Sequence, residues 1–101
     1  MEKVNKEVSQ EQIAEWKKKH GGVYRIDVDG RSCYLRKPNR KELGYAAMAG
    51  KTDPLKYNEL ILKNCWLGGD EDIRDDDDLF LSVGAVLAEI IEVKAAEIKK
   101  L

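Results

Sequence analysis

The longest periodic run of apolar positions lies near the end of the chain, in the segment LFLSVGAVLAEIIEVKAAEIKKL that spans residues 79–101. Apolar residues recur there at the spacing of one face of an α-helix, so the pattern predicts a helix over residues 78–100. The apolar face is broad in the first half of this segment, and other elements must therefore cover it. Its members are Leu79, Phe80, Val83, Val86, Leu87, Ile90, Ile91, Val93, Ile98 and Leu101.

A second pattern, of period two, predicts a β-hairpin over residues 23–36. Asp29-Gly30 is a strong signal for a two-residue type I′ turn. A loop of that length places the apolar positions of both strands on one face and the polar positions on the other. A hairpin with two strands is only marginally stable in water, so we expect its apolar face to pack on the C-terminal helix. The buried face consists of Tyr24, Ile26, Cys33 and Leu35.

Start and stop signals predict three further helices, over residues 9–19, 40–49 and 54–66. Ser9 and Asn39 are each followed three positions later by Gln or Glu, as in a capping box. Pro54 suits a first helical turn, where its missing N–H costs nothing. The predicted fold is therefore α+β and mostly helical, with about four helices and one antiparallel hairpin in the N-terminal half. We expect a flexible tail over residues 1–8 and a single domain over residues 9–101.

The charge balance limits the classes of partner. The chain has 101 residues, with 18 basic and 19 acidic side chains and a formal net charge of −1. This gives no overall attraction to nucleic acid or to an anionic membrane. The basic runs at residues 17–19 and 36–41 are interpreted as a helix end and a solvated corner. The first residues are too polar for a signal peptide, and no apolar run approaches the roughly 20 residues that span a bilayer. We expect a cytoplasmic protein, in the cytoplasm of a host cell if a virus encodes it.

The acidic segment at residues 70–78 invites comparison with a calcium-binding loop. Arg74 occupies a ligand position of the EF-hand pattern, Asp75 replaces its glycine, and Leu81 stands where the bidentate glutamate belongs. The segment is interpreted as a solvated loop that caps the following helix. A cation-responsive module remains an alternative.

Side chains for catalysis or metal binding are scarce. His20 is the only histidine, and Cys33 and Cys65 are the only cysteines. Zinc sites need several such ligands at short spacing, and nucleophilic catalysis needs a neighbouring base. The sequence predicts no enzyme, no catalytic residues, no metal site and no cofactor. Both cysteines are interpreted as buried, reduced thiols.

Two stretches resemble a known family. They are LRKPNRKEL at residues 35–43 and DPLKYNELILKNCWLGGDEDI at residues 53–73. A strand that ends in such a helix start, followed by a helix that closes on Leu-x-x-Cys-Trp and an acidic loop, resembles small tail assembly chaperones of long-tailed bacteriophages and prophages. The resemblance covers residues 23–101 and carries no catalytic motif.

The resemblance implies a non-enzymatic role during tail assembly. Proteins of this family bind the tape measure protein, keep its helical chain soluble, and help tail tube subunits assemble around it. The expected partners are thus the tape measure protein, the tail tube protein, or both, with a second copy of the chain as a further candidate. Nucleic acid and membranes are not expected partners. An accessory subunit of the phage head–tail junction or tail tube is the alternative function.

Two surfaces suit such partners. The edges of the hairpin are able to accept a strand from a partner or a second copy, and the broad first half of the last helix is able to hold a client helix. The candidate partner-binding residues are Tyr24, Tyr34, Leu79, Val86 and Val93.

Overall fold

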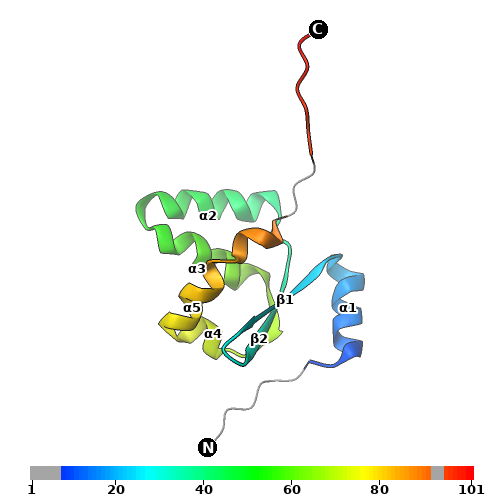
Figure 1. Cartoon of the computed structure of the whole chain (residues 1–101), viewed down its shortest axis with the longest axis vertical. Coiled ribbons are helices and arrows are strands. Elements are labelled where there is room, and N and C mark those ends of the chain that lie inside the picture. The colour runs from blue at the N-terminus through cyan, green and yellow to red at the C-terminus, as the bar shows by residue number, and fades with distance from the viewer. Residues whose placement is uncertain (1–7, 92–94) are drawn as a thin grey trace, which may run out of the picture.

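The computed structural model describes residues 8–91 and 95–101. In these residues the chain forms an α+β fold, in which helices surround a three-stranded antiparallel sheet (Figure 1). The predicted fold class is confirmed. Residues 1–7 of the predicted tail and Val93 of the predicted last helix lie outside the described residues.

The predicted hairpin forms with the predicted register. Strands β1 (Val23–Val28) and β2 (Arg31–Arg36) pair so that Ile26 lies opposite Cys33 and Tyr24 opposite Leu35. Asp29 and Gly30 have φ values of 50° and 74°. Two consecutive positive φ values are what a type I′ turn requires. The turn therefore sets the register that puts one face of the hairpin in the core.

A third strand was not predicted from the sequence. Strand β3 (Trp66–Gly69) pairs antiparallel with β2, so that β2 is central in the order β1-β2-β3. Gly69 makes this pairing possible, because it has φ of 124° and a Cβ there would lie 2.5 Å from the carbonyl oxygen of Ser32. The expectation that both hairpin edges are open is wrong, since β3 occupies the outer edge of β2.

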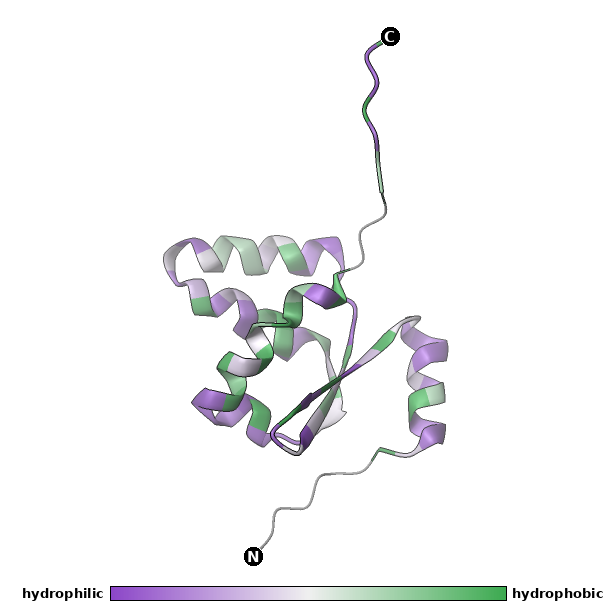
Figure 2. Cartoon of the chain, viewed as in Figure 1, coloured by the Kyte–Doolittle hydropathy of each residue, from purple (hydrophilic) through white to green (hydrophobic). Residues whose placement is uncertain are grey.

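The two faces of the sheet are covered by different helices. Helix α1 (Gln10–His20) lies on one side of the strands in Figure 1, where the Trp16 ring packs 5.8 Å from the ring of Tyr34. The other helices cover the face that carries Cys33 and Leu35, both fully buried. Figure 2 shows hydrophobic residues alternating with hydrophilic ones along the helices and strands. Buried core residues are Cys33, Leu35, Ala46, Ile61, Leu62, Cys65, Ile73, Val83, Leu87 and Ile90.

Helices α2 (Arg40–Thr52) and α3 (Pro54–Cys65) form an antiparallel pair joined at Asp53. The Asn39–Glu42 capping box forms in both directions, as the sequence predicts. Gly50 does not end α2 as expected. The helix continues to Thr52, while Gly50 lies so close to Tyr57 of α3 that a Cβ would come within 3.2 Å of the Tyr57 Cβ. Gly50 therefore allows the two helices to approach each other near their junction.

The prediction of one long C-terminal helix over residues 78–100 is wrong. The segment instead forms most of α5 (Asp77–Gly84) and the 3₁₀ helix η1 (Leu87–Ile90), and residues 95–101 are not helical. A separate short helix, α4 (Asp72–Asp75), precedes it. The break follows Gly84, where a Cβ would lie 2.9 Å from the side-chain amide nitrogen of Asn58. After the break, η1 turns to pack against α3, while α5 packs against β1. The change of direction lets Val83, Leu87 and Ile90 all reach the core.

Candidate functional site: an apolar groove with charged walls

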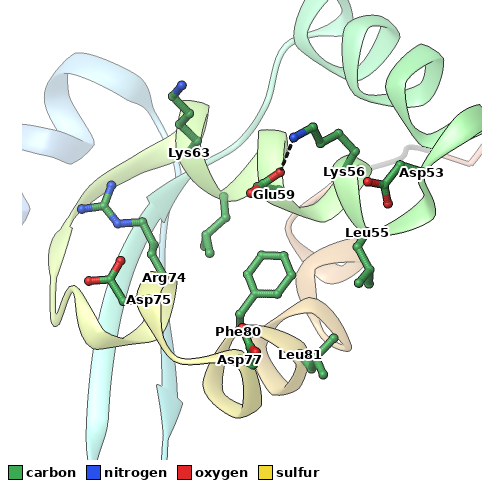
Figure 3. A pocket seen from close by; sticks show the side chains of 11 residues that line it. Asp53, Leu55, Lys56, Glu59, Lys63, Arg74, Asp75, Asp77, Phe80 and Leu81 are labelled. Carbon is green, nitrogen blue, oxygen red and sulfur yellow. Dashed lines mark ion pairs between the residues drawn. The ribbon is translucent and has the colours of Figure 1, made fainter.

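An open groove lies between α3 and the corner formed by α4 and α5 (Figure 3). Its volume is about 710 Å³. Leu55 and Phe80 face the groove with Leu81, and the deeper Leu62 belongs to the core. Leu55 and Leu81 are 53% and 51% exposed, high values for leucines on amphipathic helices. The groove therefore presents apolar side chains that the described part of the chain does not cover.

The spacing of residues on the helices explains how the groove is built. On α3, Leu55, Glu59 and Leu62 lie four and three positions apart, so they share one face. On α5, Asp77 and Leu81 lie four positions apart and share a second face. Leu62 is buried in the core, whereas Leu55 is in the first turn of α3 and remains exposed.

Both walls of the groove carry charges of both signs. The α3 side presents Asp53, Lys56, Glu59 and Lys63, and the side of α4 and α5 presents Arg74, Asp75 and Asp77 (Figure 3). The Lys56 Nζ lies 3.0 Å from the Glu59 carboxylate, and this hydrogen bond raises the pKa of Lys56. The groove therefore offers both acidic and basic groups beside its apolar centre.

Arg74 closes one end of the groove and is held by two contacts. Its guanidinium lies 4.2 Å from the centre of the Trp66 ring, a cation–π distance. Its Nη2 also lies 3.7 Å from the Glu71 carboxylate. The described residues that line the groove are apolar or charged, and they include no histidine, serine or cysteine. This composition suits the binding of a polypeptide with apolar and charged side chains.

Four of the five residues predicted from the sequence to bind a partner lie in the described part of the chain, and none of these four lines the groove. Tyr24 packs against the core, and Tyr34 lies on the opposite face of the sheet beside Trp16. Leu79 is buried at 7% exposure, while Val86 is partly exposed between α5 and η1. Val93 lies outside the described residues. The four described residues therefore do not gather on one surface.

Sequence reasoning missed Leu55 and Leu81. One signal was present in the pattern, because both are large apolar residues on amphipathic helices. Leu81 falls outside the stripe that Leu79 and Val83 continue into the core. An apolar residue outside the buried stripe of a helix indicates a binding surface when a second such residue lines the same groove.

The motif at residues 35–43 has a structural role at the junction of three elements. Arg36 at the end of β2 binds the Glu42 carboxylate through both of its Nη atoms, at 3.0 and 2.7 Å. Its Nη2 also donates to the Asn64 carbonyl near the end of α3, at 2.7 Å. The bond to Arg36 lowers the pKa of Glu42, and the bond to Glu42 raises the pKa of Arg36. Arg36 is therefore part of a partly buried junction, unlike the solvated side chain expected from the sequence.

None of the family models, curated proteins or solved structures compared with this chain matches it.

The acidic segment at residues 70–78 stabilises the fold through hydrogen bonds, ion pairs and a helix cap. Asp70 is buried and its carboxylate accepts a hydrogen bond from the Asp72 N–H at 3.1 Å. Arg31 of β2 lies between the two carboxylates, with Nε 3.9 Å from Asp70 and 3.5 Å from Asp72. Asp76 caps α5 by accepting from the Leu79 N–H. Within residues 8–91 and 95–101, no three His, Cys, Asp or Glu side chains are arranged to hold a metal ion.

Both cysteines are buried and free, as predicted. Burial raises the pKa of Cys33 to about 12, with a smaller contribution from the nearby charge of Asp27. Burial likewise raises the pKa of Cys65 to about 11. Both thiols are protonated at neutral pH and serve as small apolar side chains. No helix among the described residues has the length and apolar character needed to cross a bilayer.

Proposed function

We propose that this protein is a non-enzymatic tail assembly chaperone of a long-tailed phage or prophage, and that it binds the tape measure protein, the tail tube protein, or both. The resemblance of residues 35–43 and 53–73 to that family suggests the role. The observation that carries the binding function is the groove, where Leu55, Phe80 and Leu81 lie between walls that carry charged side chains of both signs. An amphipathic helix docks in this way, with its apolar side chains in a groove and its flanks against the rims.

The proposal accounts for two features of the chain together. The Arg36–Glu42 junction holds the start of α2 against the end of α3, and α3 forms one wall of the groove. The α3 wall of the groove and the junction that supports it therefore both fall within the resembling segments. A rigid groove of this kind binds a helix with less loss of conformational freedom than a flexible surface does.

Direct binding tests the proposal. Fluorescently labelled helical fragments of the tape measure protein encoded near this chain are titrated with the protein, and binding is followed by fluorescence anisotropy. We expect saturable binding that Leu81→Asp weakens at least tenfold, since a charge in an apolar contact costs at least about 1.4 kcal/mol. Met48→Asp is the matched control, because Met48 is 69% exposed on α2 and lies outside the groove.

Three results would count against the proposal. Absence of binding to tape measure and tail tube fragments would contradict the chaperone role. Equal weakening by Leu81→Asp and Met48→Asp would contradict the groove as the binding surface. Stable incorporation of the protein into finished phage particles would favour a structural accessory subunit over a chaperone.

A further inference from the structure

Strand β1 is an edge strand whose outward backbone groups are open to pairing. The turn at Asp29-Gly30 closes on the facing residues Val28 and Arg31, which form the first hydrogen-bonded pair of the hairpin. Such pairs alternate with positions whose backbone groups point the other way, so the N–H and C=O groups of Arg25 and Asp27 point away from β2. Among the described residues no other strand pairs with β1 on that side.

The side chains beside this edge are also uncovered. Arg25 and Asp27 are 60% and 57% exposed. Helix α1 covers their face of the sheet over β2 and β3, where the Trp16 ring lies 5.8 Å from that of Tyr34 and a Cβ at Gly68 would come within 3.0 Å of it. The outer side of β1 therefore has room for another strand.

The charges on β1 select one register for pairing with a second copy of the same strand. Facing residues of opposite charge stabilise an antiparallel pair, and facing residues of like charge destabilise it. A two-fold pairing centred on Arg25 places two arginines opposite each other, and one centred on Asp27 does the same with two aspartates. A pairing centred on Tyr24 leaves Asp27 beyond the paired strand.

A pairing centred on Ile26 places Arg25 of each copy opposite Asp27 of the other. The outward N–H and C=O groups of these two residues then face each other and can exchange both hydrogen bonds, and the two-fold axis makes this pair twice. We propose that two copies of this chain form a dimer in which their β1 strands pair antiparallel in this register.

The apolar face of β1 fits the same register. Tyr24, Ile26 and Val28 pack against the core but are only partly buried. In a pairing centred on Ile26, the two Ile26 side chains face each other, and Tyr24 of one copy faces Val28 of the other. These positions are non-hydrogen-bonded pairs, in which side chains approach each other most closely. One face of the pair thus gains charge pairs and the other gains apolar contacts.

The pairing closes the sheet and sets the expected strength of the dimer. The remaining edges are the β3 strands, each only four residues long, and short edge strands resist further pairing. One strand from each copy makes a small contact, so we expect a weak, reversible dimer with a Kd of roughly 10 µM to 1 mM. No residue of β1 lines the groove, so the dimer does not rest on the proposed function.

Exchange of charges tests the register. Sedimentation equilibrium at low ionic strength, at concentrations up to about 1 mM, compares the unaltered chain with Arg25→Asp, Asp27→Arg and the double variant that carries both substitutions. Each single variant places like charges opposite each other and should dimerise at least about fivefold more weakly. The double variant restores opposite charges in this register and should dimerise within about twofold of the unaltered chain. Lys41→Asp is the matched control for Arg25→Asp, since Lys41 is exposed on α2, and it should not weaken the dimer.

Hydrogen exchange on the unaltered chain locates the contact without any substitution. The amides of Arg25 and Asp27 should exchange more slowly as the protein concentration rises. The amide of Ile26, which faces Cys33 of β2 in a hydrogen-bonded pair, should exchange at a rate that does not depend on concentration. This measurement decides the matter even if a charge variant unfolds, which circular dichroism would reveal.

Several outcomes would overturn the inference. They are a monomer up to about 1 mM, a dimer in which the Arg25 and Asp27 amides exchange independently of concentration, or a double variant that dimerises no better than the single ones. Protection of these two amides in a monomer would mean that β1 pairs with a segment of its own chain. Failure of the tape measure fragment to bind would remove the proposed function and leave each of these results unchanged.

Discussion

Two parts of the molecule differ in how a predicted helix is stabilised. One is the Arg36–Glu42 junction at the start of α2, and the other is the segment at residues 95–101. Both have clear sequence patterns, a capping box after a strand in one case and helical apolar spacing in the other. At the junction, Arg36, Glu42 and Asn39 form the expected helix start with hydrogen bonds of 2.7 to 3.0 Å. In the C-terminal segment the helix is absent and Ile98 is fully exposed.

The difference lies in where the stabilising partners are. Asn39 and Glu42 satisfy each other's backbone N–H groups three residues apart, so the helix start needs no distant element. Apolar spacing, in contrast, stabilises a helix only when another surface covers the apolar side chains. Leu79 and Val83 find that surface in the core, and Ile98 does not. A pattern that depends on burial is thus a weaker predictor than one satisfied by neighbouring residues.

The largest change in the free energy of unfolding should come from a substitution in strand β3 of the sheet, which supports the junction. Replacement of Gly69 by Ala places a Cβ 2.5 Å from the Ser32 carbonyl oxygen and 2.7 Å from the Cys33 Cα, at a φ of 124° that disfavours side chains. We expect a loss of about 3 kcal/mol or more in the free energy of unfolding, measured by urea denaturation. Gly44→Ala is the control, because the space around Gly44 in α2 is open and the change should stabilise the helix by about 0.5–1 kcal/mol. Similar unfolding midpoints for the two variants would contradict this account of β3.

A smaller loss in the free energy of unfolding is expected from a substitution at the Arg36–Glu42 junction. Glu42→Gln removes the charge of a partly exposed ion pair with Arg36 but keeps a side chain able to cap α2. The expected cost at pH 7 is about 1 kcal/mol, since neighbouring solvent weakens the pair. A cost of zero would show that the junction is held by packing alone.

The junction should also be sensitive to pH in a defined direction. The folded-state pKa of Glu42 is lowered from its ordinary value of 4.5, mainly by the hydrogen bond from Arg36. Its contribution is therefore fully present above about pH 4.5 and is lost as the pH falls through the lower folded-state pKa. Between pH 6 and pH 3, the difference in unfolding free energy between the unaltered chain and Glu42→Gln should shrink. A difference independent of pH would rule out this ion pair as its source.

The smallest change in the free energy of unfolding is expected from deletion of the segment at residues 95–101. Deletion of residues 95–101 removes side chains that are exposed in the described chain, so the free energy of unfolding at dilute concentration should change by less than about 0.5 kcal/mol. Thermal and urea denaturation would measure it. A destabilisation as large as that of Glu42→Gln would show that the segment packs on its own domain.

Much of the fold follows from short-range signals in the sequence. The Asp29-Gly30 turn, the caps at Ser9 and Asn39, and the strand register all form as predicted. Strand β3 could not be predicted in the same way. Trp66 continues the apolar row of α3, and the glycines after it signal a helix end, yet the backbone pairs with β2, distant in sequence. Pairing with a distant strand decided the conformation of these residues.

The residues of the groove could likewise not be predicted from short-range signals in the sequence. Lys56 and Asp77 belong to different helices and line one groove only because the fold brings α3 near α4 and α5. Neither residue stands out in the sequence as part of a binding site. The exposed Leu55 and Leu81 become meaningful once the structure brings them to one groove. Their burial state depends on long-range packing, which the apolar pattern of each helix does not contain.

The central claim is that the groove between α3 and α5 binds an amphipathic helix. Chemical-shift mapping on the ¹⁵N-labelled protein, titrated with a helical tape measure fragment, tests it residue by residue. The account predicts saturable shifts that are largest at Leu55, Phe80 and Leu81 and small at Tyr24 on the edge strand β1. Saturable shifts centred on β1, with the groove unaffected, would contradict it.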